Sequence, residues 1–556
     1  MSDGYKIVLS GSKTTVSDFR HASWIGFLGC IPSNYPKIPY GRKMMEDIFF
    51  PTHSDREGRL EFAPYPLRKI EAALLDYGFK QDEVIIADPR KLDAAIGPET
   101  KVVGLTVHDP MGYSAVSQLN ACIFRLINWW PAPSYTAVDF DCLIRNQILK
   151  KYGSKLIIGG PGIWQLEEHP EMFKQWGIDC LVSGEAESIV GPLFESAVKG
   201  QPLPERTSSP RPLRADRVPL IRGPSTGGIV EITRGCGRGC QFCTPDLLFF
   251  GSIPKERILR EVDIQVKHGT KRIDLHSEDA LFYGRKPGGF EVNHDAVVDL
   301  FSSVRKFPGV RQVSTDFVAC STVKSAPKTV KAISEIMKLD KNHPGYIETG
   351  LETVSPRLVK NIMPGKVKPY AIEDWPDVIN DALGILDDNR WFTVASMMTG
   401  LPTETEHDVI KSIEFIDRIK HHNVFVWVFP LMPLRAMLKN AAKWAPEYTP
   451  LRQELILKAT RHSINLINRE TSRILKILPA WYRPAANLAL KYVTGMTMRF
   501  LKGTDEAIAR SEDRLNLYKD LQYGQNREGE AIMHVSSVVN DLVKLAGLHG
   551  GDQEAG

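Results

Sequence analysis

The sequence predicts an α/β chain in three parts: an N-terminal doubly wound (Rossmann-like) domain, a partial (β/α)6 barrel and an α-helical C-terminal domain. The first two parts are predicted because short apolar strands alternate with helical patterns in two separate runs, which a Pro-, Ser- and Arg-rich stretch divides. The third part is predicted because no strand pattern follows residue 440. The predicted boundaries are 1–200, a linker at 201–228, 229–440, 441–548 and a disordered tail at 549–556.

The first run contains five predicted strands joined by helical patterns. A helix predicted over residues 67–78 ends at Gly78, a residue type that commonly stops helices. In doubly wound sheets, ligands bind at the carboxyl ends of the strands, so these ends are where we look for a site. The strands are predicted at 6–10, 84–87, 102–107, 155–160 and 179–183.

The second run contains six predicted strands, which favours a six-stranded partial barrel over an eight-stranded one. The strands are predicted at 229–233, 272–276, 313–318, 346–352, 393–401 and 424–430. After them comes a long amphipathic helix predicted over 451–478. Residues 451–502 hold ten Lys or Arg and two Asp or Glu. This basic segment is either a solvated helix face or a contact face for an acidic or membrane-bound partner.

The overall composition excludes several classes of protein. With 43% hydrophobic and 24% charged residues, the chain is neither disordered nor collagen-like. A net charge of +4 is too small for a protein that coats nucleic acid, so no nucleic-acid partner is expected. No uninterrupted apolar run could span a membrane, and the N-terminus lacks the pattern of a secretory signal, so we expect a cytoplasmic protein. Eight cysteines in 556 residues make no disulfide framework.

Three of those cysteines, Cys236, Cys240 and Cys243, lie within eight residues directly after a predicted strand. Three adjacent thiolates suit zinc or an iron–sulfur cluster, but a structural zinc takes four ligands and no nearby pair completes such a set. A [4Fe–4S] cube held by three cysteines leaves one iron open to an external chelator. Glycines at 235, 237 and 239 would let the loop wrap closely around a cube.

The C-x3-C-x2-C spacing, with an aromatic at Phe242, resembles that of the radical S-adenosylmethionine (SAM) enzymes. The resemblance covers residues 229–430 and implies that the open iron binds SAM and that an electron from the cluster cleaves it to a 5′-deoxyadenosyl radical. HSEDALFYG (276–284) stands where that family binds the SAM amine, although it lacks the usual Gly-Gly-Glu. YIETGLETVSPRLVKNIMPGK (346–366) and MTGLPTETEHD (398–408) resemble later family segments. The implied SAM-binding residues are Phe242, Glu278, Asp279, Glu352 and Gly400.

A doubly wound domain ahead of such a barrel resembles the cobalamin-binding subclass of these enzymes. The matching pieces are VVGLTVHDPMGYS (102–114), LIIGGPGIWQLEEHP (156–170) and DCLVSGEAES (179–188). The usual cobalt-ligating D-x-H-x-x-G is altered here, so His108 is either a cobalt ligand or a loop histidine. A nucleotide-binding domain of another kind is the alternative. The implied cobalamin-binding residues are Thr106, His108, Gly112, Gly159, Gly160, Gly184 and Glu185.

The resemblance implies a methyltransferase acting on an unactivated carbon, in which one SAM supplies the methyl group through cobalamin and another supplies the radical. Among archaeal members, one kind methylates a glutamine of methyl-coenzyme M reductase, so its substrate is a protein or peptide. Another kind forms rings or cross-links in tetraether lipids, which would involve peripheral membrane contact. A flavodoxin- or ferredoxin-type electron donor is implied as a partner. Hydrogen abstraction with SAM alone and a cobalamin-bearing sensor are the remaining alternatives.

Overall fold

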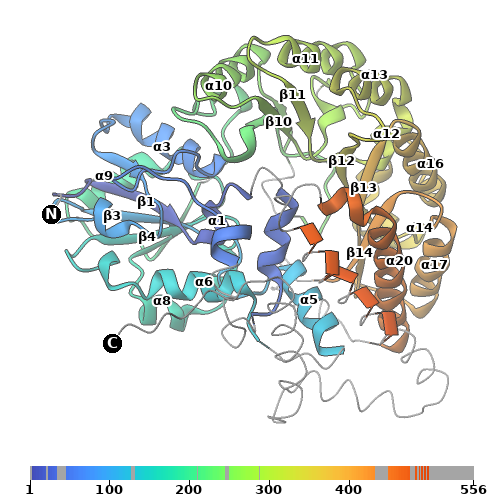
Figure 1. Ribbon diagram of the computed structural model, residues 1–556, viewed down its shortest axis with the longest axis horizontal. Coiled ribbons are helices and arrows are strands. Elements are labelled where there is room, and N and C mark those ends of the chain that lie inside the picture. Colours follow the sequence, from blue (N-terminus) through green and yellow to red (C-terminus); the bar gives the residue numbers. More distant parts are fainter. Residues whose placement is uncertain are drawn as a thin grey trace.

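The computed structural model describes residues 3–19, 23–33, 45–126, 132–209, 211–243, 249–286, 288–431 and 449–475, with a few more residues between 483 and 499. Two α/β units lie side by side, as Figure 1 shows. The N-terminal unit is built around one sheet, and the second unit is an arc of strands covered by helices on its outer side.

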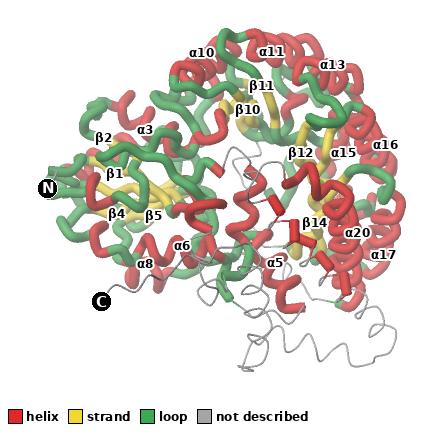
Figure 2. Tube along the Cα trace, viewed as in Figure 1, coloured by secondary structure: helices red, strands yellow, loops and turns green. Residues whose placement is uncertain are grey.

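The N-terminal unit is a parallel sheet with helices on both faces (Figure 2). Alternate residues of each strand pack into two separate cores. Val8, Val103 and Ile158 belong to one core, whereas Ile7, Val102 and Ile157 belong to the other. Burial on both faces explains why these strands read as continuous apolar runs. The strands are β1 (Ile7–Gly11), β2 (Val84–Ile86), β3 (Val102–Thr106), β4 (Lys155–Gly159), β5 (Cys180–Ser183) and β6 (Arg206–Ser208).

The strand order is β2-β1-β3-β4-β5-β6, so the winding reverses between β1 and β3. A doubly wound sheet opens a crevice beyond the carboxyl ends of its strands at such a reversal, and this is where ligands bind. The unit's helices are α1 (Lys13–Val16), α3 (Tyr65–Tyr77), α4 (Leu92–Ala95), α5 (Ala115–Leu126), α6 (Tyr135–Ile144), α7 (Ile163–Glu167), α8 (Pro170–Trp176) and α9 (Val190–Val198).

The segment predicted as a linker, 201–228, contributes to the sheet. Its residues Arg206–Ser208 form β6, which pairs with β5 in parallel. Val218 and Ile221 of the same segment are buried. Because β6 is a short edge strand with mostly exposed side chains, it leaves no apolar alternation in the sequence for a strand prediction to use.

Within the residues described, the second unit has six parallel strands, as predicted. Three form the sheet β11-β10-β7, three form the sheet β12-β13-β14, and a bridge between Phe317 and Glu348 joins the two into one arc. The strands are β7 (Ile229–Glu231), β10 (Arg272–His276), β11 (Gln312–Thr315), β12 (Gly345–Glu352), β13 (Trp391–Thr399) and β14 (Val424–Pro430), with a small antiparallel ribbon of β8 (Thr233–Arg234) and β9 (Gly251–Ser252).

Helices cover the outer side of this arc (Figure 2). Along β13 and β14 the burial alternates, with every second side chain packed under the helices and the others facing the hollow of the arc. The helices are α10 (Lys255–Lys267), α11 (His294–Lys306), α12 (Cys320–Ser325), α13 (Pro327–Met337), α14 (Pro356–Ile362), α15 (Pro364–Val367), α16 (Trp375–Asp388) and α17 (Glu406–Arg418).

The C-terminal helix α20 (Pro450–Ile474) packs along β14, the last strand of the arc (Figure 1). The Ser463 hydroxyl accepts a hydrogen bond from the Val426 amide and donates one to the Val426 carbonyl, so the helix satisfies backbone groups at this edge. The predicted helix at 451–478 is thus confirmed over most of its length. The rest of the predicted helical domain, apart from a few residues, and the predicted tail at 549–556 lie outside the described residues.

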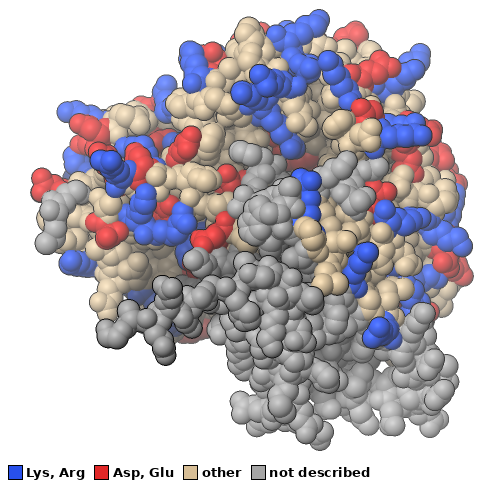
Figure 3. Space-filling view, in the orientation of Figure 1, with Lys and Arg blue, Asp and Glu red and all other residues tan. Residues whose placement is uncertain are grey.

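Within the described part of the chain, no helix is long and apolar enough to cross a membrane. On the face drawn in Figure 3, Lys and Arg side chains are interspersed with Asp and Glu over the described surface. The described part of that face therefore carries no broad positive field.

Candidate active site

The three clustered cysteines lie on the loop that follows β8. Gly235, Gly237 and Gly239 all have positive φ, near 66°, 65° and 72°, so the loop turns repeatedly in a conformation that side chains disfavour. Cys240 is buried, while Cys236 and Cys243 are half-buried. All three thiols are free of disulfides. The loop therefore presents three sulfurs from a tightly curved backbone.

The thiols fit a cluster better than a single ion. Among the described residues, no three His, Cys, Asp or Glu side chains converge closely enough to hold one metal ion. A hydrogen bond from the Cys243 thiol, assisted by the nearby Lys366 ammonium, lowers the pKa of Cys240 and favours its thiolate. Cations also surround the loop and would offset the negative charge of a thiolate-bound cluster. These residues fit the [4Fe–4S] cluster that the motif implies.

Arg238, inside the cysteine loop, ties that loop to the rest of the barrel. Its guanidinium is buried and donates to the Asp279 carboxylate at 2.8 Å and to the Ser321 hydroxyl at 3.1 Å. It also donates to the carbonyls of Gly365 and Lys366, both at 3.2 Å. A Cβ on Gly365 would lie 1.9 Å from the Arg238 carbonyl, so only glycine permits this approach. The cysteine loop is thus held from three other segments of the barrel.

The predicted SAM-binding carboxylates have different environments. Asp279 is fully engaged by Arg238 and by the Thr322 hydroxyl, which anchors the cysteine loop. Glu352 accepts from Lys366 at 2.5 Å, beside Cys240. Glu278 is half-buried, and burial raises the pKa of its carboxyl group. Of these three carboxylates, Glu278 is the one best placed to receive a ligand cation.

The remaining predicted SAM residues are Phe242 and Gly400, and Phe242 packs against an apolar cluster that contains Leu401, the neighbour of Gly400. This cluster also contains Leu358, and the Phe242 ring lies 6.0 Å from the Lys366 ammonium. Gly400, with φ 83°, donates its amide to Glu404 at 2.8 Å. The structure therefore brings the Phe242 and Gly400 segments together at the carboxyl ends of the strands.

His276, at the end of β10, forms an ion pair with Asp316. Burial alone lowers its pKa, but the charge of Asp316 and a hydrogen bond to it raise the pKa of His276 to about 10. The imidazole is therefore charged at neutral pH. Glu348 on β12 lies near the pair, and burial together with the Asp316 charge raises the pKa of Glu348 to about 7. The hollow of the barrel is polar on this side.

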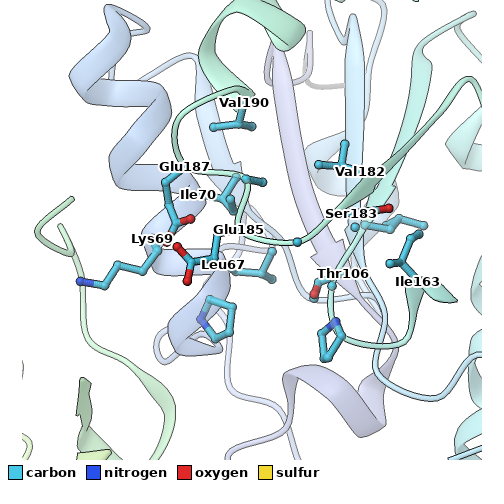
Figure 4. Close-up of a pocket in the computed structure, with 18 of the residues that line it drawn as sticks. Leu67, Lys69, Ile70, Thr106, Ile163, Val182, Ser183, Glu185, Glu187 and Val190 are labelled. Carbon is cyan, nitrogen blue, oxygen red and sulfur yellow. The ribbon is translucent and has the colours of Figure 1, made fainter. Parts of the chain in front are cut away.

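A cavity of about 500 Å³ joins the two units. It begins at the carboxyl ends of β1, β3, β4 and β5, where apolar side chains such as Leu9, Ile157 and Val182 line it, and it ends at Gln241, Cys243 and His276 of the barrel. Figure 4 shows Thr106, Val182 and Ser183 at the strand ends, with Leu67 and Ile70 of α3 alongside them. The crevice predicted from the topology thus opens towards the cysteine loop.

Five of the seven residues predicted to bind cobalamin line this cavity: Thr106, Gly159, Gly160, Gly184 and Glu185. His108 and Gly112 do not line it, and the His108 side chain is exposed. Gly160 is required by the protein itself, because a Cβ there would lie 2.6 Å from the Val107 carbonyl at a φ of 107°. Gly159 has no such restriction, since the nearest atom to its Cβ would be the Val182 carbonyl at 3.4 Å.

Arg234, at the cavity's edge, connects the two units. It donates to Glu185 at 2.7 Å and to Glu187 at 2.6 Å, both on the loop after β5, and to Glu231 of the barrel at 3.0 Å. Figure 4 shows the two loop carboxylates close to each other. Burial alone would lower the pKa of Arg234, but the charges of Glu231 and Glu187 raise it. The guanidinium therefore stays charged and holds the β5 loop against the barrel.

Sequence reasoning missed Arg234, Arg238 and Lys366. Arg234 precedes the cysteine motif, Arg238 lies inside it, and Lys366 is the last residue of the segment 346–366. Each of them was therefore next to or within a recognised pattern. No periodicity marks a buried cation, and only the fold shows which carboxylate each one meets.

Comparison with protein-family models matches residues 230–416 to the radical SAM superfamily. Among curated proteins, the chain is 29% identical over 206 residues to the ribosomal protein uS12 methylthiotransferase RimO of Leptospira biflexa, covering 37% of this chain and 41% of that protein. It is 22% identical over 231 residues to a tRNA-2-methylthio-N(6)-dimethylallyladenosine synthase of Desulfosudis oleivorans, covering 40% of this chain and 46% of that one. The chain thus spans less than half of either relative.

Among solved structures, the fold is similar to that of the radical SAM methyltransferase TsrM from Kitasatospora setae, solved with cobalamin and a [4Fe–4S] cluster bound. The TM-score is 0.51 at 12% identity, covering 91% of this chain and 100% of that one. At this identity the likeness is one of fold, and it extends over both α/β units.

Proposed function

We propose that this chain, which carries a radical SAM domain at residues 230–416 and is an enzyme that uses radical SAM chemistry, is a cobalamin-dependent methyltransferase acting on an unactivated carbon. The radical SAM domain implies a [4Fe–4S] cluster and SAM. Cobalamin and methyl transfer are the further steps of the proposal.

One observation carries these further steps: a single cavity runs from the carboxyl edge of the N-terminal sheet to Cys243 and His276. A methyl group passing from a corrin to a substrate radical requires the corrin and the radical source to share one enclosed space. A cavity of this position supports a cofactor at the sheet that faces the chemistry at the cysteine loop. Two independent binding domains would need no such connection.

The bound cofactors would supply radical generation and methyl donation, and the chain's residues would position them. Cys236, Cys240 and Cys243 would hold the cluster, and the Glu278 carboxylate would receive the SAM ammonium. Leu9, Ile157 and Val182 would exclude water from the sheet end of the cavity. Arg234 would keep the β5 loop, and any cofactor resting on it, in register with the barrel.

The substrate we propose is a protein segment, with a glutamine of methyl-coenzyme M reductase as the specific candidate. The polar side of the barrel hollow supports a substrate with hydrogen-bonding groups. His276 is charged there, and Glu348, with a pKa of about 7, is partly protonated at neutral pH, so it can both donate and accept. A tetraether lipid chain, the alternative substrate, would offer the Glu348 carboxyl group no hydrogen-bonding partner.

The test combines corrinoid content with product mass. Protein purified anaerobically after growth with cobalamin should contain corrinoid in a near one-to-one ratio to chain. Candidate peptides incubated with enzyme, SAM and a reductant should gain the mass of one methyl group. Absence of corrinoid, or a gain of a methylthio group such as the curated relatives' names describe, would overturn the proposal. Loss of two hydrogens from a lipid substrate would favour ring formation.

A further inference from the structure

Arg285 is a buried arginine beside the cysteine loop, in the segment that follows β10. Its exposed fraction is 9%, and its guanidinium lies 4.0 Å from the Phe250 ring centroid and 4.3 Å from that of Phe282. The Phe290 ring completes the enclosure at 5.5 Å. Cation–π contacts of this kind hold a guanidinium in place without neutralising its charge.

The hydrogen bonds of Arg285 lead to the cysteine loop. One terminal nitrogen donates to the Cys236 carbonyl at 3.1 Å, and the other donates to the Gly289 carbonyl. Its Nε is buried and has no hydrogen-bond partner among the described residues. The guanidinium therefore fixes the backbone of a predicted cluster ligand and has one donor to spare.

Among the residues that the structure describes, no carboxylate forms an ion pair with Arg285, although the charge of Asp279 acts on it from nearby. Two other buried cations lie at the loop, and each has a carboxylate partner. Arg238 pairs with Asp279 at 2.8 Å, and Lys366 pairs with Glu352 at 2.5 Å. Arg285, in contrast, contacts only carbonyl oxygens and ring faces among the described residues. Burying an unpaired charge is costly, so a nearby anion is expected to compensate it. A cluster bound to three thiolates is negative, and Cys236 brings that charge to this arginine.

We propose that Arg285 is a positioning residue for the cluster, which fixes Cys236 through its carbonyl and makes the cluster easier to reduce through its unbalanced charge. Reduction adds one electron to the cluster, supplied by an external one-electron donor of the flavodoxin or ferredoxin class, and it makes the cluster more negative. A fixed positive charge nearby stabilises that product more than the oxidised form. This inference rests on the radical SAM domain alone, and neither cobalamin nor the substrate enters it.

The test measures the reduction potential of the reconstituted cluster in the full chain, by electron paramagnetic resonance during a dithionite titration without SAM. In R285Q, the ratio of reduced to oxidised cluster at a fixed potential should fall at least tenfold, which corresponds to about 59 mV for one electron. R285K keeps the charge and should recover most of that ratio. The control R305Q removes a guanidinium that also donates to a backbone carbonyl, that of Val310, and it should change nothing.

A variant with the opposite sign separates charge from packing. D279N removes the carboxylate that balances Arg238, so it should raise the ratio of reduced to oxidised cluster. Equal potentials in R285Q and the unmodified chain would overturn the proposal, as would equal losses in R285Q and R285K. If R285Q holds no iron while R305Q does, the result supports the anchoring of Cys236. The effect of charge is then measured by the ratio of reduced to oxidised cluster in D279N. A ratio that D279N leaves unchanged would then overturn the proposal.

Discussion

The two ends of the cavity are built on different physical principles. At the sheet end, aliphatic side chains and glycines make an apolar slot, with the carboxylates of Glu185 and Glu187 at its edge. At the barrel end, the cysteine loop and the segments that contact it contain buried cations, thiols and ion pairs. Under the proposed function, the first end would select a ligand by shape and burial, and the second by charge and metal ligation. A change at one end should then leave the cofactor at the other end in place.

The largest effect is expected from the cysteines. C236A, C240A or C243A should remove the cluster and abolish SAM cleavage, because a cube that leaves one iron open to SAM needs all three thiolates. Iron content and 5′-deoxyadenosine formation after anaerobic reconstitution measure this. C142A is the matched control, since Cys142 is exposed on α6. Deoxyadenosine made by C240A would refute the assignment.

The sheet end can be tested by filling the slot. G159L should lower corrinoid occupancy at least tenfold while iron content stays the same, because its side chain would enter the cavity past Val182. Gly160 is a poor choice for this test: a leucine there would collide with the Val107 backbone and disrupt the loop itself. Unchanged corrinoid in G159L would show that the cofactor, if bound, sits elsewhere.

The connection between the two ends depends on Arg234. R234M should destabilise the protein by about 3 kcal/mol, because it leaves the Glu185, Glu187 and Glu231 carboxylates without their shared cation. Denaturant unfolding at neutral pH measures the change. At lower pH the carboxylates become protonated, so the difference from the unmodified chain should shrink. A variant as stable as the parent at neutral pH would argue against this role.

The smallest effect concerns Glu348. Its folded-state pKa, about 7, lies above the value for an unfolded glutamate, so the folded chain binds this proton more tightly and loses stability as pH rises from about 4.5 to 7. E348Q removes this loss and should be more stable than the parent above pH 7 by up to about 3 kcal/mol, less the part that solvent screens at this half-buried carboxyl group. The two proteins should converge near pH 4.5. Thermal unfolding at several pH values measures the difference.

Both ends of the cavity could be predicted in part from the sequence, each from a different signal. Cys236, Cys240 and Cys243 were identifiable because their spacing alone implies a metal site. The strands were identifiable because buried parallel strands are continuous apolar runs. The sheet end was predicted through Thr106, Gly159, Gly160, Gly184 and Glu185, which share the carboxyl edge of a doubly wound sheet.

Contacts between distant segments could not be predicted. Arg238 meets Asp279 and Gly365 only because β10 and α15 fold against the cysteine loop. Glu185 was predicted at the cofactor site, but its ion pair with Arg234 depends on how the two units meet. Strand β6 was missed because three edge residues with mostly exposed side chains carry no hydrophobic signal.

The central claim is that both ends of one cavity serve the same turnover. The most direct measurement follows enzyme, candidate peptide and SAM with a deuterated methyl group under reducing conditions. S-adenosylhomocysteine and 5′-deoxyadenosine should form in near-equal amounts, and the deuterated methyl group should appear on a carbon of the peptide. Substrate-dependent 5′-deoxyadenosine without S-adenosylhomocysteine would contradict the account, because the barrel end would then act without the sheet end.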